Sequence, residues 1–310
     1  MRLLIPFAST LSEAGTHALR DLSLPNLSRL LAMATPAERM GSDEYSLTPP
    51  HERALADAHG WHGDDGALPW AALHASADGI AVGDRAWGEL TPVHWNVGSD
   101  QVTLADPQAL ALGEADSRRF LDAIRDLFES EGWTVAFGAA TRWYAAHATL
   151  DGLPCASLDR VIGRNVDLWL APHPQARLIR RLQNEVQMLL YDHPLNDERE
   201  ARGELPVNSF WLSGCGRPQP AARSDAPQVD ARLRAPALAG DWAAWADAWR
   251  ELDAGPIAAL LQRAQRGDAA ALIVSGERHA QRFEAARRSA WQRLARAWRA
   301  EPVHSVLEAL

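Results

Sequence analysis

Apolar runs of strand length alternate with stretches of helical periodicity along much of the chain. Strands are expected at residues 3–7, 79–86, 90–97, 209–212 and 271–275, with hairpin-like strands at 135–137 and 143–145. Helices are expected at 24–32, 51–59, 114–131, 176–191 and 257–265, around Trp242, Trp245 and Trp249, and over a tail at 279–299. The alternation predicts an α/β fold with a mainly parallel sheet flanked by helices.

Composition along the chain suggests two lobes. The middle, residues 95–185, mixes strand and helix patterns and is expected to form a smaller inserted α+β lobe. Residues 1–94 and 186–310 would then form the core. Residues 217–240 are rich in Pro, Ala, Arg and Asp without periodicity, which is typical of a linker.

Charge and hydropathy exclude several classes of protein. The net charge of −9 over 310 residues argues against binding to duplex nucleic acid, which needs a basic face. No apolar run approaches the roughly 18 residues of a membrane span, and the first residues lack a signal-peptide pattern. We therefore expect a cytoplasmic protein that binds neither nucleic acid nor membrane.

The two cysteines, Cys155 and Cys215, are too few for a disulfide scaffold or a thiolate zinc site. Cys215 has no partner at CxxC spacing, and we interpret it as a buried, unreactive thiol.

Three segments carry a resemblance to a known family. Residues 193–199 (HPLNDER), followed by Gly203, residues 206–208 (PVN) and residues 214–216 (GCG), form the most specific one. Residues 49–61 (PPHERALADAHGW) form the second, and residues 68–72 with 79–82 the third. Together they resemble the archaeal-type cofactor-independent phosphoglycerate mutases of the alkaline phosphatase superfamily.

A closer similarity is to a bacterial group labelled either phosphoglycerate mutase or regulatory protein RpfE, which shares the segments PPHERALA, PVHW and LQNEVQMLLY. The resemblance implies an alkaline-phosphatase-like core with an inserted substrate lobe. In active members, two divalent metals activate a serine that takes and returns the phosphoryl group.

The sequence departs from this pattern at the residues that the chemistry needs. Residues 5–10, where the family has its first metal-binding aspartate, contain no carboxylate, and the nucleophilic serine aligns with His51. The late Asp-His motif is replaced by residues 273–279, and the region between Gly216 and Gly240 is reduced. We therefore expect no metal and no cofactor, because most of the ligands that would converge on the ions are missing.

Two neighbouring residues are the catalytic candidates. His51 could accept a phosphoryl group or act as acid or base, because an imidazole exchanges protons near neutral pH. Its alternative is a polar residue at a helix start. Glu52 is a second catalytic candidate, with the same alternative. Glu277 and His279 are either remnants of a metal site or surface residues at the start of a helix.

The other candidates would hold a substrate. His193, Asn196, Arg199 and Asn208 could cradle an anion through guanidinium and amide donors. Alternatively, the two asparagines cap turns while Arg199 pairs with a nearby acid.

In the inserted lobe, the resemblance implies that Arg160 and Arg164, beside Asp159, contact a carboxylate or phosphate. The alternative is a solvated surface pair. His94 is either near the site between the lobes or a structural histidine.

Two functions follow. The first is a phosphoglycerate mutase-like protein with a degenerate metal site, which binds a phosphorylated small metabolite between its lobes. The second is a non-catalytic regulatory protein that acts through a metabolite or a protein partner.

Overall fold

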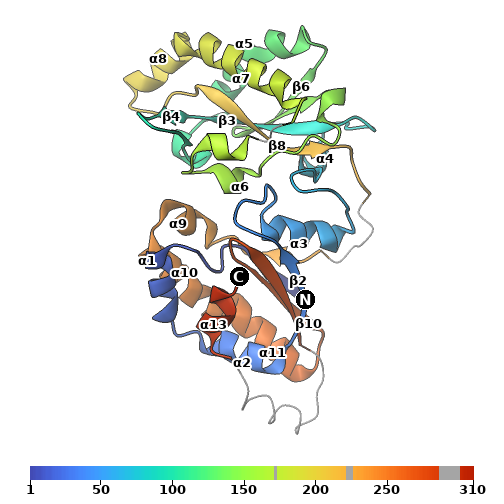
Figure 1. The fold of residues 1–310 in the computed structure, drawn as a ribbon, viewed down its shortest axis with the longest axis vertical. Helices are drawn as coiled ribbons and strands as arrows, with labels where there is room; N and C mark the ends of the chain where they lie inside the picture. Colours follow the sequence, from blue (N-terminus) through green and yellow to red (C-terminus); the bar gives the residue numbers. More distant parts are fainter. Residues whose placement is uncertain (171–172, 221–225, 286–300) are drawn as a thin grey trace. The chain divides into compact units, whose positions relative to one another are not determined.

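The computed structural model describes residues 1–170, 173–220, 226–285 and 301–310. These residues form two compact units, one from Met1–Gly60 with Ala221–Leu310 and one from Trp61–Pro220 (Figure 1). Each unit has its own sheet and its own hydrophobic core.

The first unit contains a five-stranded sheet in the order β2-β11-β10-β1-β9. Its strands are β1 (Arg2–Ile5), β2 (Thr35–Gly41), β9 (Gln228–Val229), β10 (Ala270–Ser275) and β11 (His279–Ala285). β1 pairs in parallel with β10 and β9, whereas β10–β11 and β11–β2 are antiparallel. The sheet is therefore mixed, whereas the sequence predicted a mainly parallel sheet.

Side chains on alternate positions of the central strands bury opposite faces of this sheet. Leu3, Ile5 and Leu272 belong to the larger core cluster, which also includes Trp245 and Trp249. Five helices contribute to that cluster: α1 (Glu13–Arg20), α2 (Pro25–Met33), α10 (Trp242–Leu252), α11 (Ala258–Arg266) and α13 (Val303–Glu308). α9 (Arg234–Ala239) precedes α10, and a π-helical turn (Asp253–Ile257) joins α10 to α11.

The opposite face is covered by α3 (Pro50–His59). Leu4 and Ile273 pack there against Ala54 and Leu55 of this helix. α3 ends at Gly60, whose φ of 74° is the left-handed conformation common at helix C-termini, which glycine adopts without strain. The expected helix at 51–59 is thereby confirmed.

The second unit contains a four-stranded antiparallel sheet in the order β6-β7-β3-β8. Its strands are β3 (Trp87–Val93), β6 (Thr134–Ala139), β7 (Arg142–Ala146) and β8 (Ser209–Gly216). A separate hairpin pairs β4 (Trp95–Val97) with β5 (Val102–Leu104).

Helices lie on both faces of that sheet (Figure 1). α5 (Glu114–Glu129), α7 (Ala176–Tyr191) and the start of α8 (Pro194–Ala201) bury their apolar faces on one side. α4 (Trp70–Ala77) packs its alanines against Trp87 and Tyr144 on the other. α6 (Leu158–Val161) and three 3₁₀ turns, Pro107–Leu110, Ala148–Leu150 and Val166–Trp169, complete the unit. The expected long helices and the hairpin are confirmed.

Two expected elements are wrong. Residues 79–86 are not a strand, because Gly79 and Gly83 both have positive φ and interrupt the extended backbone. Residues 279–285 form strand β11 instead of the start of a helix, since they pair with β10 on one side and β2 on the other. The remainder of the predicted tail helix, 286–299, lies outside the described residues.

The boundaries also differ from those expected. Residues 61–94 belong to the second unit because β3 pairs with β7 and β8, and residues 186–220 belong there because they complete its core. The expected linker, 217–240, contains strand β9 and helix α9 within its described part. Because β9 has only two residues, it shows no alternating pattern in the sequence, and its pairing with β1 was not predicted.

Among the described residues, none of the helices has the length and apolar character needed to cross a membrane.

Candidate functional site

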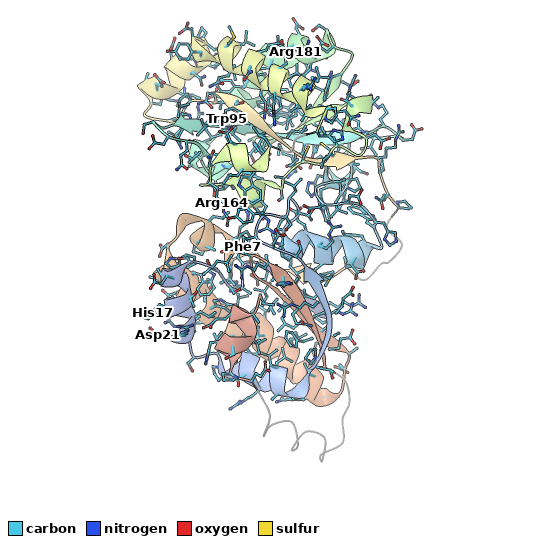
Figure 2. The ribbon with its side chains drawn as sticks, in the orientation of Figure 1. Phe7, His17, Asp21, Trp95, Arg164 and Arg181 are labelled. Carbon is cyan, nitrogen blue, oxygen red and sulfur yellow. The ribbon has the colours of Figure 1, made fainter. Side chains whose placement is uncertain are left out.

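Open α/β sheets bind ligands at the carboxyl ends of their parallel strands, so a site is expected at that edge of the first unit's sheet. β1 ends at Ile5, and Phe7, which follows it, has a φ of 58°. This left-handed backbone is unusual for a bulky residue. Two hydrogen bonds hold it: the indole of Trp245 donates to the Phe7 carbonyl at 2.9 Å, and Ala8 N–H donates to the Ser275 carbonyl at 2.7 Å. Phe7 is labelled in Figure 2.

His51 lies next to this edge of the sheet. It occupies the first turn of α3, where Pro49 is the N-cap and Pro50 the first helical residue, a position that suits the fixed φ of proline. Its ring centroid lies 5.5 Å from that of Phe7, and the residue is only 8% exposed. The predicted catalytic histidine is therefore a buried residue at a positively polarised helix end.

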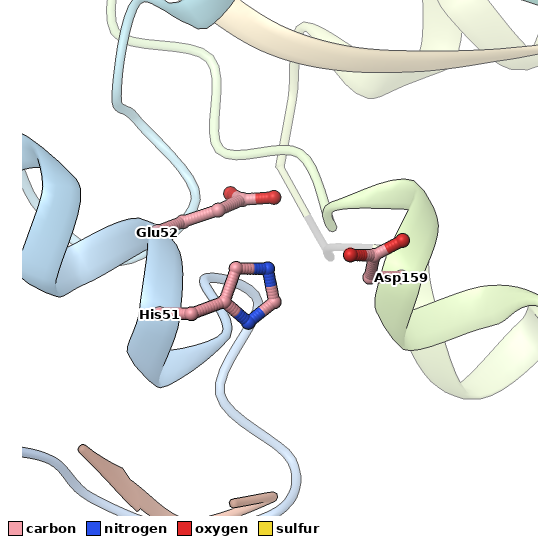
Figure 3. Close-up of side chains that lie close together, drawn as sticks. All are labelled: His51, Glu52 and Asp159. Atoms are coloured by element: carbon pink, nitrogen blue, oxygen red, sulfur yellow. The ribbon is translucent and has the colours of Figure 1, made fainter. Parts of the chain in front are cut away.

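Glu52 follows in the same helical turn (Figure 3). Its carboxylate lies where an acidic side chain favours the helix dipole, which is the alternative role that the sequence left open. His51 and Glu52, the two catalytic candidates, therefore lie side by side in the first turn of α3.

Two carboxylates follow the other strands of the parallel part, and both are already bound by protein groups. Glu277, after β10, accepts hydrogen bonds from the hydroxyl of Thr10 at 3.0 Å and from Leu11 N–H at 2.8 Å. Asp230, after β9, receives two bonds from the guanidinium of Arg232, at 2.8 and 3.0 Å. In Glu277 both bonds go to the same oxygen, Oε1, whereas in Asp230 each carboxylate oxygen accepts one bond.

His279 is a strand residue and not the surface helix residue that the sequence suggested. Its backbone N–H donates to the carbonyl of Leu310 at 2.6 Å. Burial lowers the pKa of its imidazole, and the charges of Arg39 and Arg278 lower it further, so His279 is neutral at neutral pH.

The candidates on and after α6 belong to the second unit. Ser157 caps this short helix by accepting a hydrogen bond from Asp159 N–H. Asp159 extends from the helix (Figure 3), and Arg160 is 3% exposed, which excludes the alternative of a solvated surface arginine. The Arg164 guanidinium lies 5.7 Å from the ring centroid of Trp169 and is labelled in Figure 2.

The predicted anion cradle of α8 is occupied by the protein's own backbone. The Asn196 amide donates to the carbonyls of Leu190 and Val207, both at 2.8 Å, and its oxygen accepts from Val207 N–H at 2.9 Å. His193 caps α8, where its Nδ1 accepts from Leu195 N–H at 3.3 Å.

Asn208 and Arg199 are used in the same way. Asn208 binds both the N–H and the carbonyl of Trp95, at 2.7 and 3.0 Å. Arg199 is 1% exposed and donates to the carbonyls of Leu205 and Leu110, while its remaining nitrogen pairs with Glu204 at 3.0 Å. The alternative in which Arg199 pairs with an acid thus describes the contacts that are seen.

His94 also contacts backbone: its Nδ1 lies 2.8 Å from the carbonyl of Pro206. The structure gathers His94, Asn196 and Asn208 around the segment that leads into β8, where they fix the chain's path.

Sequence patterns did not point to Phe7 or to the pairing of the two cysteines. A positive φ at a phenylalanine has no sequence signal. Cys155 and Cys215 are 60 residues apart, yet their sulfur atoms lie 3.5 Å from each other, and only the fold reveals this.

Comparison with known structures finds distant similarities. A cofactor-independent phosphoglycerate mutase from Thermoplasma acidophilum DSM 1728 is 15% identical, with a TM-score of 0.39, over 91% of this chain and 89% of that one. The PH0037 protein from Pyrococcus horikoshii is 10% identical, with a TM-score of 0.44, over 92% of this chain and 87% of that one. Comparisons with family models and with curated proteins give no match.

Proposed function

We propose that this protein binds a phosphorylated small metabolite at the start of α3, with His51 as the main ligand group, and that it does so without a two-metal centre. The observation that supports the proposal is the position of His51: a buried imidazole in the first turn of a ten-residue helix, next to the carboxyl end of β1. A helix N-terminus and an imidazole both favour an anion.

The carboxylates that follow β9 and β10 already have protein partners. Glu277 and Asp230 are engaged by hydroxyl, backbone and guanidinium donors, so they are poorly available to a metal. A phosphate group is the anion that the sequence resemblance suggests. In this proposal the protein is a phosphoglycerate mutase-like binder, and its role is regulation by metabolite binding.

The alternative is an enzyme in which His51 accepts the phosphoryl group or moves a proton, with Glu52 as its partner. Their adjacency on one helical turn is the observation that keeps this alternative open. In both cases His51 is central, so binding and turnover must be measured separately.

Calorimetric titration of the full chain tests the proposal. The ligands are 3-phosphoglycerate, inorganic phosphate and glycerate, the last of which lacks the phosphate. We expect binding of the phosphorylated compounds only, and a loss of about tenfold or more in affinity in His51→Ala, since hydrogen bonds to a charged group contribute roughly 1.5–3 kcal/mol. The matched control is His17→Ala, because His17 is exposed on α1 (Figure 2).

Equal affinity of His51→Ala and the parent chain would exclude His51 as the ligand group. A second measurement follows conversion of 3-phosphoglycerate to 2-phosphoglycerate with added manganese. Turnover that depends on manganese would refute the metal-free proposal, whereas turnover without metal that His51→Ala abolishes would establish the enzymatic alternative.

The acidic neighbour offers an additional test. Glu52→Gln removes a negative charge from the turn that would hold the phosphate, so we expect it to tighten phosphate binding by a few-fold. If Glu52 instead takes part in proton transfer, the same variant lowers turnover and leaves affinity unchanged.

A further inference from the structure

Two cysteines in the second unit lie within reach of each other. Cys215 is on β8 and Cys155 precedes α6, and their sulfur atoms are 3.5 Å apart. Both thiols are free. A disulfide has an S–S length of about 2.04 Å, so the sulfurs need to approach by only about 1.5 Å.

The surrounding contacts hold the two residues in this arrangement. Cys155 N–H donates to the Gly66 carbonyl at 2.9 Å. The indole of Trp211, on the same strand as Cys215, donates to the carbonyl of Ala156 at 2.9 Å. The segment that carries Cys155 is thus tied to the strand that carries Cys215.

Gly88, on the neighbouring strand β3, leaves space for the buried sulfur. A Cβ atom at this position would lie 3.2 Å from Cys215 Sγ and 2.6 Å from a methyl group of Leu212. Because Gly88 has no side chain, there is room beside it for the sulfur of Cys215.

The two thiols differ in accessibility. Cys215 is fully buried, whereas Cys155 is half-buried and lines a cavity of about 40 Å³ together with Pro154, Trp169 and Trp211. A water-sized molecule needs about 10–15 Å³ of such space, so a small peroxide can be accommodated. Burial, and to a lesser degree the neighbouring Cys155, raises the pKa of the Cys215 thiol. Cys155 is therefore the residue that an oxidant reaches first.

We propose that Cys155 and Cys215 are a redox-modification site that forms a reversible intramolecular disulfide on reaction with a peroxide. This inference does not depend on the proposed function.

The chemistry proceeds in two steps. The Cys155 thiolate attacks one peroxide oxygen, so that an S–O bond forms, the O–O bond breaks and the departing hydroxide takes up a proton as water. The resulting sulfenic acid is then attacked by the sulfur of Cys215. The S–S bond forms, the S–O bond breaks, and the released hydroxide takes the Cys215 proton as a second water. Two thiols are oxidised by two electrons and one hydrogen peroxide is reduced to two waters.

The cross-link would fix the segment before α6 to the central sheet of its unit. Arg160 lies on α6, five residues after Cys155. Oxidation thereby restricts the loop that presents this buried arginine, and a thiol reductant restores its freedom.

Intact-mass measurement of the full chain treated with hydrogen peroxide tests the site. We expect the mass to fall by two hydrogen atoms and to return with dithiothreitol, and proteolytic mapping to recover a peptide pair joined through Cys155 and Cys215. The oxidised form should melt about 5 °C higher, because the bond closes a long loop in the unfolded chain.

Single variants separate the two roles. Cys215→Ser should leave a sulfenic acid on Cys155 that a dione reagent traps, whereas Cys155→Ser should resist oxidation. Circular dichroism checks that each variant is folded. Since the parent chain alone shows whether the bond forms, the test does not depend on these variants.

Two results would overturn the proposal. One is a parent chain that keeps both thiols, titrated after unfolding, at peroxide concentrations that oxidise an exposed model thiol. The other is a product in which the cysteines carry only added oxygen atoms or join two separate chains.

Discussion

Arg199 illustrates how a residue of a recognisable motif can serve the fold. Its guanidinium binds two backbone carbonyls and the carboxylate of Glu204, and almost none of it is exposed. Burial lowers the pKa of this arginine, yet the group stays charged, because an arginine is not deprotonated in a protein. A buried charge of this kind is tolerated only while its partners are in place.

Arg199→Ala should therefore destabilise the second unit by about 3–5 kcal/mol, because it leaves the carbonyls of Leu110 and Leu205 without their donor. Urea denaturation measures the effect. Arg202→Ala is the matched control, since the Arg202 side chain is 44% exposed and surface ion pairs contribute at most about 1 kcal/mol. A stable Arg199→Ala protein that has lost only ligand affinity would restore the cradle interpretation.

At the scale of elements, the ion pair of Asp78 and Arg142 helps to join the end of α4 to the central sheet of the second unit. Asp78, which ends α4, accepts two bonds from Arg142 of β7 at 2.9 and 2.7 Å and one from the hydroxyl of Tyr144 at 2.7 Å. The bonds from Arg142 hold the pKa of Asp78 below its ordinary value of 3.8, against the effect of desolvation. The pKa of Tyr144 is raised, chiefly by burial and then by the hydrogen bond that its hydroxyl donates to Asp78.

This pair predicts a pH dependence. Because the pKa of Asp78 is lower in the folded than in the unfolded chain, its contribution is complete above pH 3.8 and is lost as the pH falls through the folded value. Asp78→Asn should cost about 2 kcal/mol at pH 7 and distinctly less near pH 3, as measured by urea denaturation at both values.

Asp122→Asn serves as the control at the same two values of pH, because Asp122 is mostly exposed in its pair with Arg125. An equal cost of Asp78→Asn at pH 7 and at pH 3 would show that the carboxylate charge does not matter.

The elements also show how far a sequence can be interpreted. The helix at 176–191 was predicted to the residue, because its apolar face has a clear helical period and a proline follows. β11 was missed because its single arginine, its glutamine and its two alanines favour a helix locally, while its strand conformation comes from pairing with β10 and β2. Pairing between distant segments leaves little trace in local periodicity.

At the candidate site, too, the sequence predicted local structure but not tertiary contacts. The resemblance and the PPHER segment located His51 at a helix start, where the structure has it. Whether a donor faces a ligand or the backbone is not encoded in spacing, and the amides of Asn196 and Asn208 turned out to face backbone. Residue type identified the polar positions, and only the tertiary structure showed their partners.

At the scale of the whole molecule, the two units differ in how the chain builds them. The second unit uses one continuous segment, Trp61–Pro220, whereas the first combines Met1–Gly60 with Ala221–Leu310. All the strands of the antiparallel sheet, and the helices that cover it, come from that continuous segment.

Residues 61–220 expressed alone should therefore fold. We expect mixed helix and sheet signals in circular dichroism and a single cooperative transition in urea, because the segment has its own core. Residues 1–60 expressed alone are the control and should lack such a transition, since among the described residues β1 pairs only with strands from the other end of the chain. A segment 61–220 without cooperative unfolding would mean that the antiparallel unit needs the rest of the chain.

The pairing of β1 has a consequence during synthesis. This strand leaves the ribosome before its neighbours β9 and β10, which are translated more than two hundred residues later. The apolar segment Leu3-Leu4-Ile5 must therefore wait unpaired while the intervening unit emerges and folds. The topology therefore makes this nascent strand a segment that a chaperone needs to shield until its partners are made.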